Sequence, residues 1–194
     1  NSYRIIFIHV ASAWMSMLIY VVMAVFSAAA LVTNNKMCSI FSSAMAPTGA
    51  LMAFLALFSG SFWGRPTWGT HWVWDARLTS ELILLFLYLG FLALQSAIAD
   101  HRRADKACAV IAIVGVVNVP IIYFSVKWWN TLHQGASITS KGSSIAPIML
   151  YTLLLMVVAF WLYSFASTFV RARSMILERE RRLTWVQARV KEGK

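Results

Sequence analysis

Five long apolar stretches constrain the fold of this chain more than any other feature of its sequence. They cover residues 5–32, 40–62, 79–99, 107–126 and 145–170, with short polar connections between them. A helix of about 20 predominantly apolar residues spans a bilayer, so each stretch is long enough. Helices and closed barrels are the structures that satisfy the backbone in lipid. The sequence lacks the alternating segments of about ten residues that build a barrel, so it favours helices.

Composition indicates the same class of protein. Of the 194 residues, 60% are hydrophobic and 12% are charged, and the mean hydropathy is +0.69. A soluble domain of this length needs more polar surface than that. We therefore predict an all-α integral membrane protein, with five transmembrane helices as a single domain over residues 1–170 and a basic tail over residues 171–194.

The basic residues predict how the bundle is oriented. The formal net charge is +10, and twelve of the 17 lysines and arginines fall in one set of connections, mainly residues 101–106 and the tail. Positive charge marks the inner side of a membrane protein, so the N-terminus and the connections 63–80 and 127–145 are predicted to lie outside. The tail is predicted to form a short amphipathic helix on the inner surface. The sequence shows no basic face of the kind that nucleic-acid binding requires.

Two smaller features have structural interpretations. Cys38 and Cys108 lie far apart, with no CxxC motif and no histidine at zinc-site spacing. We expect them to be packing residues and not a disulfide. Asn118 and Pro120 within the fourth stretch predict a kinked helix, because proline removes a backbone hydrogen bond.

Tryptophan is concentrated in the two predicted outer connections. Six of the nine tryptophans lie there: Trp63, Trp68, Trp72, Trp74, Trp128 and Trp129. An aromatic belt at the membrane interface explains some of them, but a belt should occur on both sides, and the inner side has only Trp185. Clustered indoles can instead form a platform for a large planar apolar ligand. Gly64, Pro66 and Gly69 predict that the first half of this segment is not a regular helix.

Asp75, Arg77 and Glu81 follow these tryptophans and allow two interpretations. They could hold the polar groups of a ligand on the platform. Alternatively, Asp75 favours the dipole at the start of the third helix, and Arg77 with Glu81 forms an ion pair at i,i+4 spacing. The residues alone leave both interpretations open.

Three of the four histidines lie on the predicted outer side. His9 falls inside the first apolar stretch, where an ionisable residue usually marks a functional site, although a hydrogen bond to a neighbouring helix would also explain it. His133 follows two tryptophans and could be an exposed loop residue, and His71 allows either interpretation. Two imidazoles beside an aromatic surface fit a bis-histidine heme. His101, in the inner connection, is expected to be solvated.

Three motifs carry a resemblance to a known family. They are SYRIIFIHV near the start, GRPTWGTHWVWDARLTSE in the middle and NVPIIYFSVKWWNTLHQGAS at residues 118–137. The middle motif resembles the tryptophan-rich WWD signature of heme-handling membrane proteins. Together, and in this order, the three resemble the heme exporter protein C family over nearly the whole chain.

The resemblance implies a heme site. His9 and His133 would be the axial ligands of a heme b iron. The residues expected to hold the heme are Trp63, Trp68, Trp72, Trp74, Asp75, Arg77, Trp128 and Trp129. His71 departs from the family pattern, which leaves open whether it joins the site.

The resemblance also implies partners and a location. The chain would present heme, for cytochrome c biogenesis, to a periplasmic heme chaperone at the outer face of a bacterial inner membrane; a mitochondrial inner membrane is the less favoured alternative. Its partners would be the ATPase and membrane subunits of an ABC transporter and a small single-span subunit. The chain itself is expected to be a carrier and not an enzyme. The family has six transmembrane helices, so we expect this chain to lack the first, in keeping with its odd helix count.

Two other functions are compatible with the residues. A cytochrome b-type electron-transfer protein usually stacks two hemes across the bilayer, whereas the candidate ligands here gather on one side. A non-heme scaffold would use its tryptophans to contact lipid or a partner helix, and it would be colourless when purified.

Overall fold

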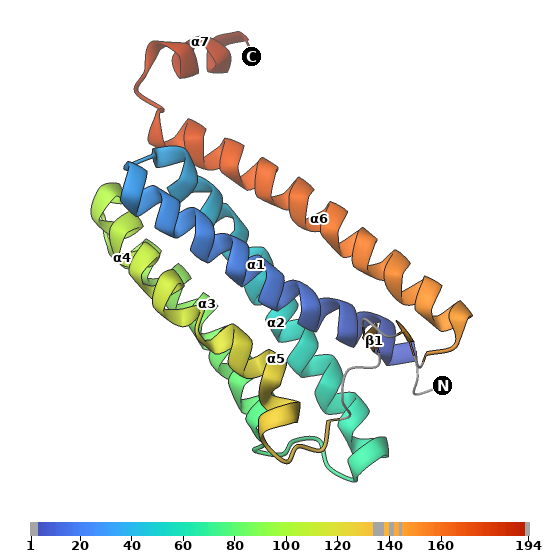
Figure 1. Ribbon diagram of the computed structural model, residues 1–194. Helices are drawn as coiled ribbons and strands as arrows, with labels where there is room; N and C mark the ends of the chain where they lie inside the picture. Colours follow the sequence, from blue (N-terminus) through green and yellow to red (C-terminus); the bar gives the residue numbers. More distant parts are fainter. Residues whose placement is uncertain (1–3, 134–137, 140–141, 144, 193–194) are drawn as a thin grey trace.

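Long helices account for nearly all of the described chain. The computed structural model describes residues 4–133, 138–139, 142–143 and 145–192. The helices are α1 (Ile5–Thr33), α2 (Lys36–Trp68), α3 (Ala76–Ala97), α4 (His101–Gly115), α5 (Asn118–Trp128), α6 (Pro147–Arg179) and α7 (Thr184–Glu192) (Figure 1). Two short strands, β1 (Ile138–Thr139) and β2 (Gly142–Ser143), pair antiparallel between α5 and α6. Five segments are long and apolar enough to cross a membrane, namely α1, α2, α3, α4 with α5, and α6. The predicted all-α membrane bundle is confirmed.

Small side chains allow α2 to pack closely against its neighbours. Its small buried residues include Ser42, Ser43, Ala44, Ala46, Thr48, Gly49, Ala50, Ala53, Ala56, Gly60 and Gly64. Such residues let the backbones of membrane helices approach each other. A Cβ atom added to Gly49 would lie 2.2 Å from the ring of Tyr88 in α3, so the contact between α2 and α3 depends on the missing side chain.

Hydrogen bonds between helices satisfy the polar side chains of the interior. Ser16 in α1 donates to Oε1 of Glu81 in α3 at 2.8 Å, and the Tyr88 hydroxyl donates to the carbonyl oxygen of Ser16 at 2.7 Å. Ser27 and Ser42 join α1 to α2 through their hydroxyl oxygens, 2.7 Å apart. Polar contacts of this kind hold membrane helices together where water is excluded.

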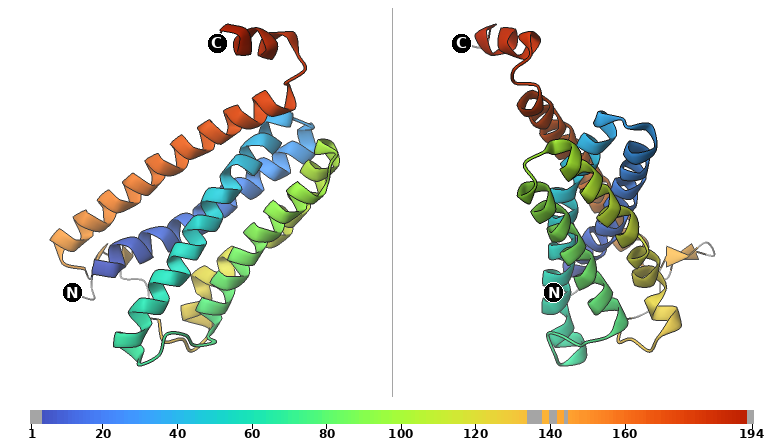
Figure 2. Two further views of the ribbon diagram at one scale, coloured as in Figure 1. Left: turned by 180° about the vertical axis from the view of Figure 1, so that it is seen from behind. Right: turned by 90° about the vertical axis from the view of Figure 1, so that its left-hand side faces the viewer.

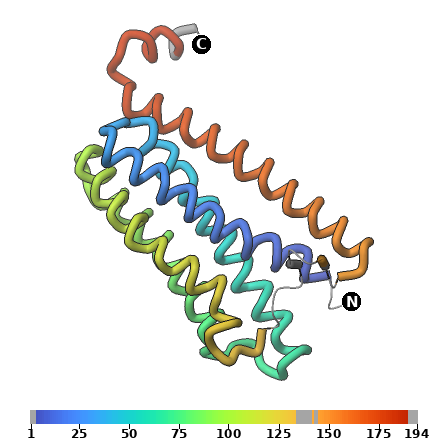
Figure 3. Tube along the Cα trace, in the orientation of Figure 1, coloured from blue at the N-terminus to red at the C-terminus, as the bar shows by residue number. Residues whose placement is uncertain are grey.

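α6 is the least covered of the spans. It runs along the outside of the bundle (Figures 2 and 3). Its buried residues are Leu153, Ser164, Thr168 and Ala172, most of them in its second half. The opposite end of α6 is anchored, because Arg179 makes two hydrogen bonds of 2.8 Å to the carboxylate of Asp105 in α4.

One sequence expectation about α2 is wrong. We predicted that the helix ends near residue 62 and that Gly64, Pro66 and Gly69 prevent a regular helix, but α2 continues to Trp68. Pro66 removes its own N–H bond to the preceding turn, but the helix continues for two more residues to Trp68. The helix ends at Gly69, which has a φ of +78° and donates its N–H to the carbonyl of Arg65 at 2.9 Å. This left-handed glycine cap is a common helix end.

The fourth stretch shows the predicted interruption. The chain breaks between α4 and α5 at Val116 and Val117, three to four residues before Pro120. Asn118 donates its side-chain N–H to the carbonyl of Ser80 in α3 at 2.8 Å. This bond holds the chain against α3 directly after the break.

At the other boundaries the structure extends the predicted helices. α6 reaches Arg179, nine residues past the predicted end at residue 170, because its arginines find partners on neighbouring helices. The predicted tail helix is present as α7. Cys108 is buried and Cys38 half-buried, and both are free thiols, as expected. Lys141 and part of the predicted loop 127–145 lie outside the described residues.

Candidate functional site

The candidate site lies at one end of the bundle, where α2 and α5 finish and α1, α3 and α6 begin (Figure 1). We call it the tryptophan-rich end. After the glycine cap of α2, residues 70–75 cross to α3 without regular structure. Thr70 stabilises this crossing, because its hydroxyl donates to the carbonyl of Trp72 at 3.1 Å. Asp75 is the N-cap of α3, and its Oδ1 accepts the N–H of Leu78 at 2.8 Å. The predicted role of Asp75 at the helix start is confirmed.

His133, five residues beyond the end of α5, faces this cap. Its Nδ1 atom lies 3.6 Å from Oδ2 of Asp75, and the two side chains are only 13% and 6% exposed. The indole of Trp68 packs edge-on against the imidazole, with ring centroids 4.7 Å apart. The expected alternative, an exposed loop histidine, is therefore wrong, because Trp68 and Asp75 cover the ring.

The surroundings favour a neutral imidazole at His133. Burial lowers the pKa of His133 below its ordinary value of 6.5, and the nearby Arg77 cation lowers it further. The Asp75 carboxylate opposes these two effects. A neutral imidazole has a lone pair on one nitrogen, which is the form that binds a metal.

His9 is held by α2 from the other side of the site. Its Nδ1 lies 2.9 Å from the carbonyl oxygen of Ala56 and 3.3 Å from the hydroxyl of Ser59. A carbonyl accepts only, so Nδ1 carries the proton and Nε2 carries the lone pair. The ring fits beside Gly60, where an added Cβ would lie 2.8 Å from the imidazole. Trp63 lies on a further side, with ring centroids 5.9 Å apart.

The predicted platform tryptophans fall into separate groups. Trp63 contacts His9, Trp68 contacts His133, and Trp72 and Trp74 meet edge to face at 5.3 Å. Trp128 stacks on Phe124 at 5.1 Å and meets Trp129 at 5.8 Å. Trp74, Trp128 and Trp129 are exposed, whereas the other three are half-buried. Trp63 and Trp68 thus line the two histidines. The exposed tryptophans lie at the same end of the bundle.

Three buried polar atoms at this end have no hydrogen-bond partner among the described residues. They are Nε1 of Trp72, Oδ2 of Asp75 and Nδ1 of His133. Buried polar groups are nearly always paired in native proteins, so an unpaired cluster indicates a strained or functional site. The cluster coincides with the residues that the sequence motifs single out.

The predicted ion pair between Arg77 and Glu81 is not formed. Arg77 instead donates to the carbonyl of Ile122 in α5 at 3.0 Å, and Glu81 accepts from Ser16 in α1. Ile122 lies within α5, so this bond gives the guanidinium a partner on another helix. Arg77 therefore fixes α5 against α3 beneath the site.

The remaining histidines lie apart from this pair. His71 is exposed, and its ring nitrogens lie 3.2 Å from the carbonyl of Ser61 and 3.4 Å from Arg65. His101 is exposed at the start of α4, as expected for a solvated residue. In the part of the chain that the structure describes, no three His, Cys, Asp or Glu side chains cluster as a metal site. A bis-histidine iron needs only two protein ligands.

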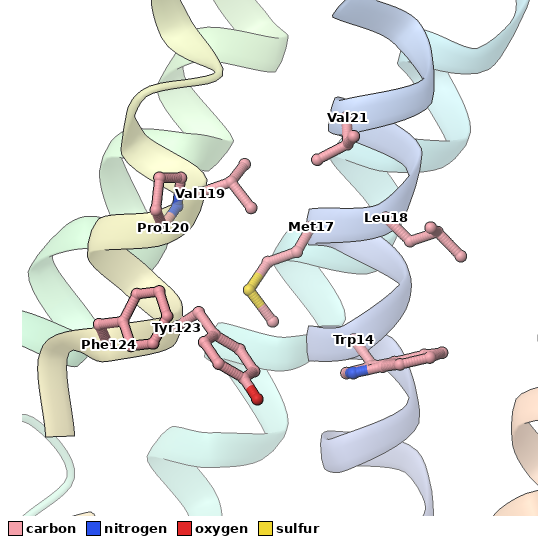
Figure 4. A pocket seen from close by; sticks show the side chains of 8 residues that line it. All are labelled: Trp14, Met17, Leu18, Val21, Val119, Pro120, Tyr123 and Phe124. Carbon is pink, nitrogen blue, oxygen red and sulfur yellow. The ribbon is translucent and has the colours of Figure 1, made fainter. Parts of the chain in front are cut away.

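An open apolar groove of about 310 Å³ runs between α1 and α5 (Figure 4). It is lined by Trp14, Met17, Leu18, Val21, Val119, Pro120, Tyr123 and Phe124. No histidine lines it, and its walls match the apolar surface that a membrane helix presents to lipid. The groove therefore does not compete with the histidine pair as a metal site.

Sequence reasoning missed Ala56, Ser59 and Gly60. Their part is to accept the Nδ1 proton of His9 and to leave room for its ring. Gly60 in an apolar helix gave a weak signal of close approach. Ala56 acts through its backbone carbonyl, which no sequence pattern can reveal.

Comparison with known proteins gives consistent results. The family model described as heme exporter protein C matches residues 1–187. Heme exporter protein C of Escherichia coli (strain K12) is 52% identical over 96% of this chain and 75% of its own length. The Haemophilus influenzae protein of the same name is 50% identical over 97% of this chain and 77% of its own length. A putative cytochrome c biosynthesis ccmC-like mitochondrial protein of Marchantia polymorpha is 46% identical over 91% of this chain and 75% of its own length.

Proposed function

The chain belongs to the heme exporter protein C family, and we propose that it binds heme b at the tryptophan-rich end through His9 and His133 and presents it to a periplasmic heme chaperone for cytochrome c biogenesis. The observation that carries the proposal is that each imidazole has an oxygen acceptor close to its Nδ1 atom. His9 donates from Nδ1 to Ala56, and Nδ1 of His133 faces Asp75. The bond to Ala56 leaves the lone pair of His9 on Nε2, and Asp75 lies close enough to His133 to favour the same tautomer there.

The residues at this end fit a heme. Heme iron accepts two neutral imidazole nitrogens, and a buried partner on the far nitrogen fixes the tautomer that each ring needs. Indoles beside both histidines offer apolar faces to a porphyrin. Trp63 and Trp68 would flank the two ligands, and Trp72 and Trp74 would contact an edge of the ring.

The other predicted contacts have distinct parts in this proposal. The exposed indoles Trp128 and Trp129 would cover the porphyrin from the α5 side, because they project from the same end. Arg77 would act by positioning α5 through the carbonyl of Ile122, and its positive charge lies near enough to affect His133. Asp75 would act through His133, whose Nδ1 atom its Oδ2 faces.

Bound heme would supply redox-active iron and a reactive porphyrin edge. With both axial positions taken by imidazole, oxygen would have no open site on the metal. The chain's own residues would hold and orient the heme at the membrane surface. This division favours a carrier that hands heme to a partner over an enzyme acting alone.

The proposed setting is a bacterial inner membrane with the tryptophan-rich end on the periplasmic side, because the basic connections gather at the other end. The partners would be the ATPase and membrane subunits of an ABC transporter, a small single-span subunit and the chaperone. The exposed apolar surface of α6 offers membrane partners a helix face.

Spectroscopy of the purified protein tests the proposal. The protein is produced with ample heme, together with its partner subunits, and its absorption spectrum and heme content are recorded in detergent. We expect a low-spin heme in the parent. His9→Gly and His133→Gly should each lose or alter it, and added imidazole should restore it.

His101→Gly, at the opposite end, and His71→Gly are the matched controls and should leave the spectrum unchanged. A colourless parent would overturn the heme proposal and favour a membrane scaffold. Two hemes per chain would favour a cytochrome b-type protein. A coloured parent with unchanged His9 and His133 variants would move the ligands elsewhere.

A further inference from the structure

Asp75 lies where it can control one of the two proposed ligands. Its Oδ1 is used by the N-cap bond to Leu78 at 2.8 Å, which fixes the carboxylate at the start of α3. Its Oδ2 points to His133 Nδ1 at 3.6 Å. Both of these facing atoms are buried, and neither has a hydrogen-bond partner in the described part of the chain.

This geometry describes a donor and an acceptor that are nearly in contact. A hydrogen bond between nitrogen and a charged oxygen is usually 2.7–2.9 Å long, so a movement of less than about 1 Å would form it. Leaving a buried carboxylate oxygen unpaired costs free energy. His133 stands on the loop after α5, outside any helix, and its ring is the more easily moved partner.

We propose that Asp75 is a positioning residue for His133, and that its carboxylate makes His133 a stronger electron donor to iron than His9. This inference rests on the proposed heme function. Oδ2 accepts the Nδ1 proton of His133 and fixes the tautomer with its lone pair on Nε2. In His9 the Nδ1 proton is accepted instead by a neutral group, the backbone carbonyl of Ala56. A carboxylate partner raises the basicity of an imidazole ligand, whereas a carbonyl does so less.

The inequality has a measurable consequence. A more basic imidazole stabilises the ferric iron over the ferrous iron, because it donates more charge. Removing the Asp75 charge should therefore favour reduction of the bound heme. A residue that only contacted the porphyrin edge would not act through the imidazole proton.

Two substitutions separate the functions of Asp75. Asp75→Asn retains the N-cap oxygen and removes the charge, but its single amide oxygen cannot accept from both Leu78 and His133. Asp75→Ser retains a capping hydroxyl and is too short to reach His133. Asp100→Asn is the matched control, because Asp100 caps α4 with the same 2.8 Å bond, to the N–H of Arg103, at the opposite end of the bundle.

The measurement is a potentiometric titration of the heme-loaded protein, with electron paramagnetic resonance of the ferric form. At a fixed potential we expect the ratio of oxidised to reduced heme in Asp75→Asn to fall about tenfold, equivalent to about 59 mV for one electron. Asp75→Ser should shift in the same direction and release heme at least about tenfold more readily. Asp100→Asn should match the parent.

Ligand rescue shows whether Asp75 acts through the imidazole. In a His133→Gly background, imidazole and 1-methylimidazole can both bind iron, but only imidazole has an N–H left for Asp75. Asp75→Asn should lower the oxidised-to-reduced ratio with imidazole and leave it unchanged with 1-methylimidazole. Equal shifts with both ligands would overturn the proposal, because Asp75 would then act on the heme directly.

The outcomes also separate this inference from the function on which it rests. A parent without heme would overturn the proposed function and this inference together. A parent with heme, and with the same potential in both Asp75 variants, would overturn the positioning role alone.

Discussion

The two ends of the helix bundle differ in whether their buried polar side chains have hydrogen-bond partners. The end opposite the tryptophan-rich end carries residues 101–106 and the tail, and we call it the basic end. There, Arg179 and Asp105 satisfy each other with two hydrogen bonds, and Asp100 closes the first turn of α4. At the tryptophan-rich end, Oδ2 of Asp75 and Nδ1 of His133 lie 3.6 Å apart without a hydrogen bond. The indole N–H of Trp72 is also buried and has no partner among the described residues. Both ends have aspartate N-caps and buried polar side chains, so the presence of these groups alone does not distinguish them.

The difference supports the tryptophan-rich end as the candidate ligand site. Charged groups that pair with one another anchor helices and leave nothing to offer a ligand. Buried polar groups that are fixed in place without a partner destabilise the ligand-free protein. Ligand binding can offset this cost. A fixed acceptor behind each histidine is the arrangement that second-sphere residues give to metal ligands.

The most severe test of this contrast is Gly60→Ala at the tryptophan-rich end. The added Cβ would lie 2.8 Å from His9, so the ring must leave its hydrogen bond to Ala56. We expect heme content to fall about tenfold or more, measured by absorption per protein. Gly90→Ala is the control, because its Cβ would meet only the flexible end of Ile111 at 3.3 Å. Normal heme content in Gly60→Ala would contradict the placement of His9.

At the basic end, Asp105→Ala should affect stability and leave heme unchanged. The Asp105 and Arg179 side chains are 12% and 14% exposed, so the substitution leaves a largely buried cation unpaired at a cost of about 3 kcal/mol. Thermal unfolding in detergent measures the loss, and a double-mutant cycle with Arg179→Ala isolates the pair. A changed heme spectrum in Asp105→Ala would show that the two ends are coupled.

Acidification should weaken the tryptophan-rich end in particular. The pKa of His133 is lowered in the folded state, so the unfolded chain binds the proton first as the pH falls. This stabilising contribution is complete above the ordinary pKa of 6.5 and is lost as the pH falls from there through the lowered folded pKa. Melting temperatures between pH 8 and pH 5 should fall less in His133→Gln than in the parent. Equal pH dependence would argue that His133 does not titrate with a lowered pKa.

The smallest effect is expected at His71. This residue lies among the tryptophans in the sequence, but it is not part of the buried cluster at the tryptophan-rich end. Its side chain is exposed, and its contacts to Ser61 and Arg65 are long. His71→Ala should change stability by less than about 0.5 kcal/mol and leave the absorption spectrum as in the parent. A shifted spectrum would bring a third imidazole into the site.

Local patterns predicted much of the site, and they failed where a side chain had two possible partners. Asp75 was placed correctly at the start of α3, because capping depends on residues only three apart. Arg77 was assigned to Glu81 by spacing, yet it bonds to Ile122, 45 positions along the chain. Pro66 and Gly64 indicated irregular structure, although the helix continues past both to Gly69. Spacing predicts which contacts are possible, and packing selects among them.

The sequence by itself determined the class of the protein and its family. Apolar stretches of bilayer length leave helices as the favoured solution, because the backbone must satisfy itself in lipid, and three motifs in order specify the family. Only the tertiary structure decided what stands behind each histidine. His9 depends on a carbonyl 47 positions away, and His133 faces a carboxylate 58 positions away. Such pairs depend on how α1, α2, α3 and the loop after α5 meet in space, which hydropathy and spacing do not encode.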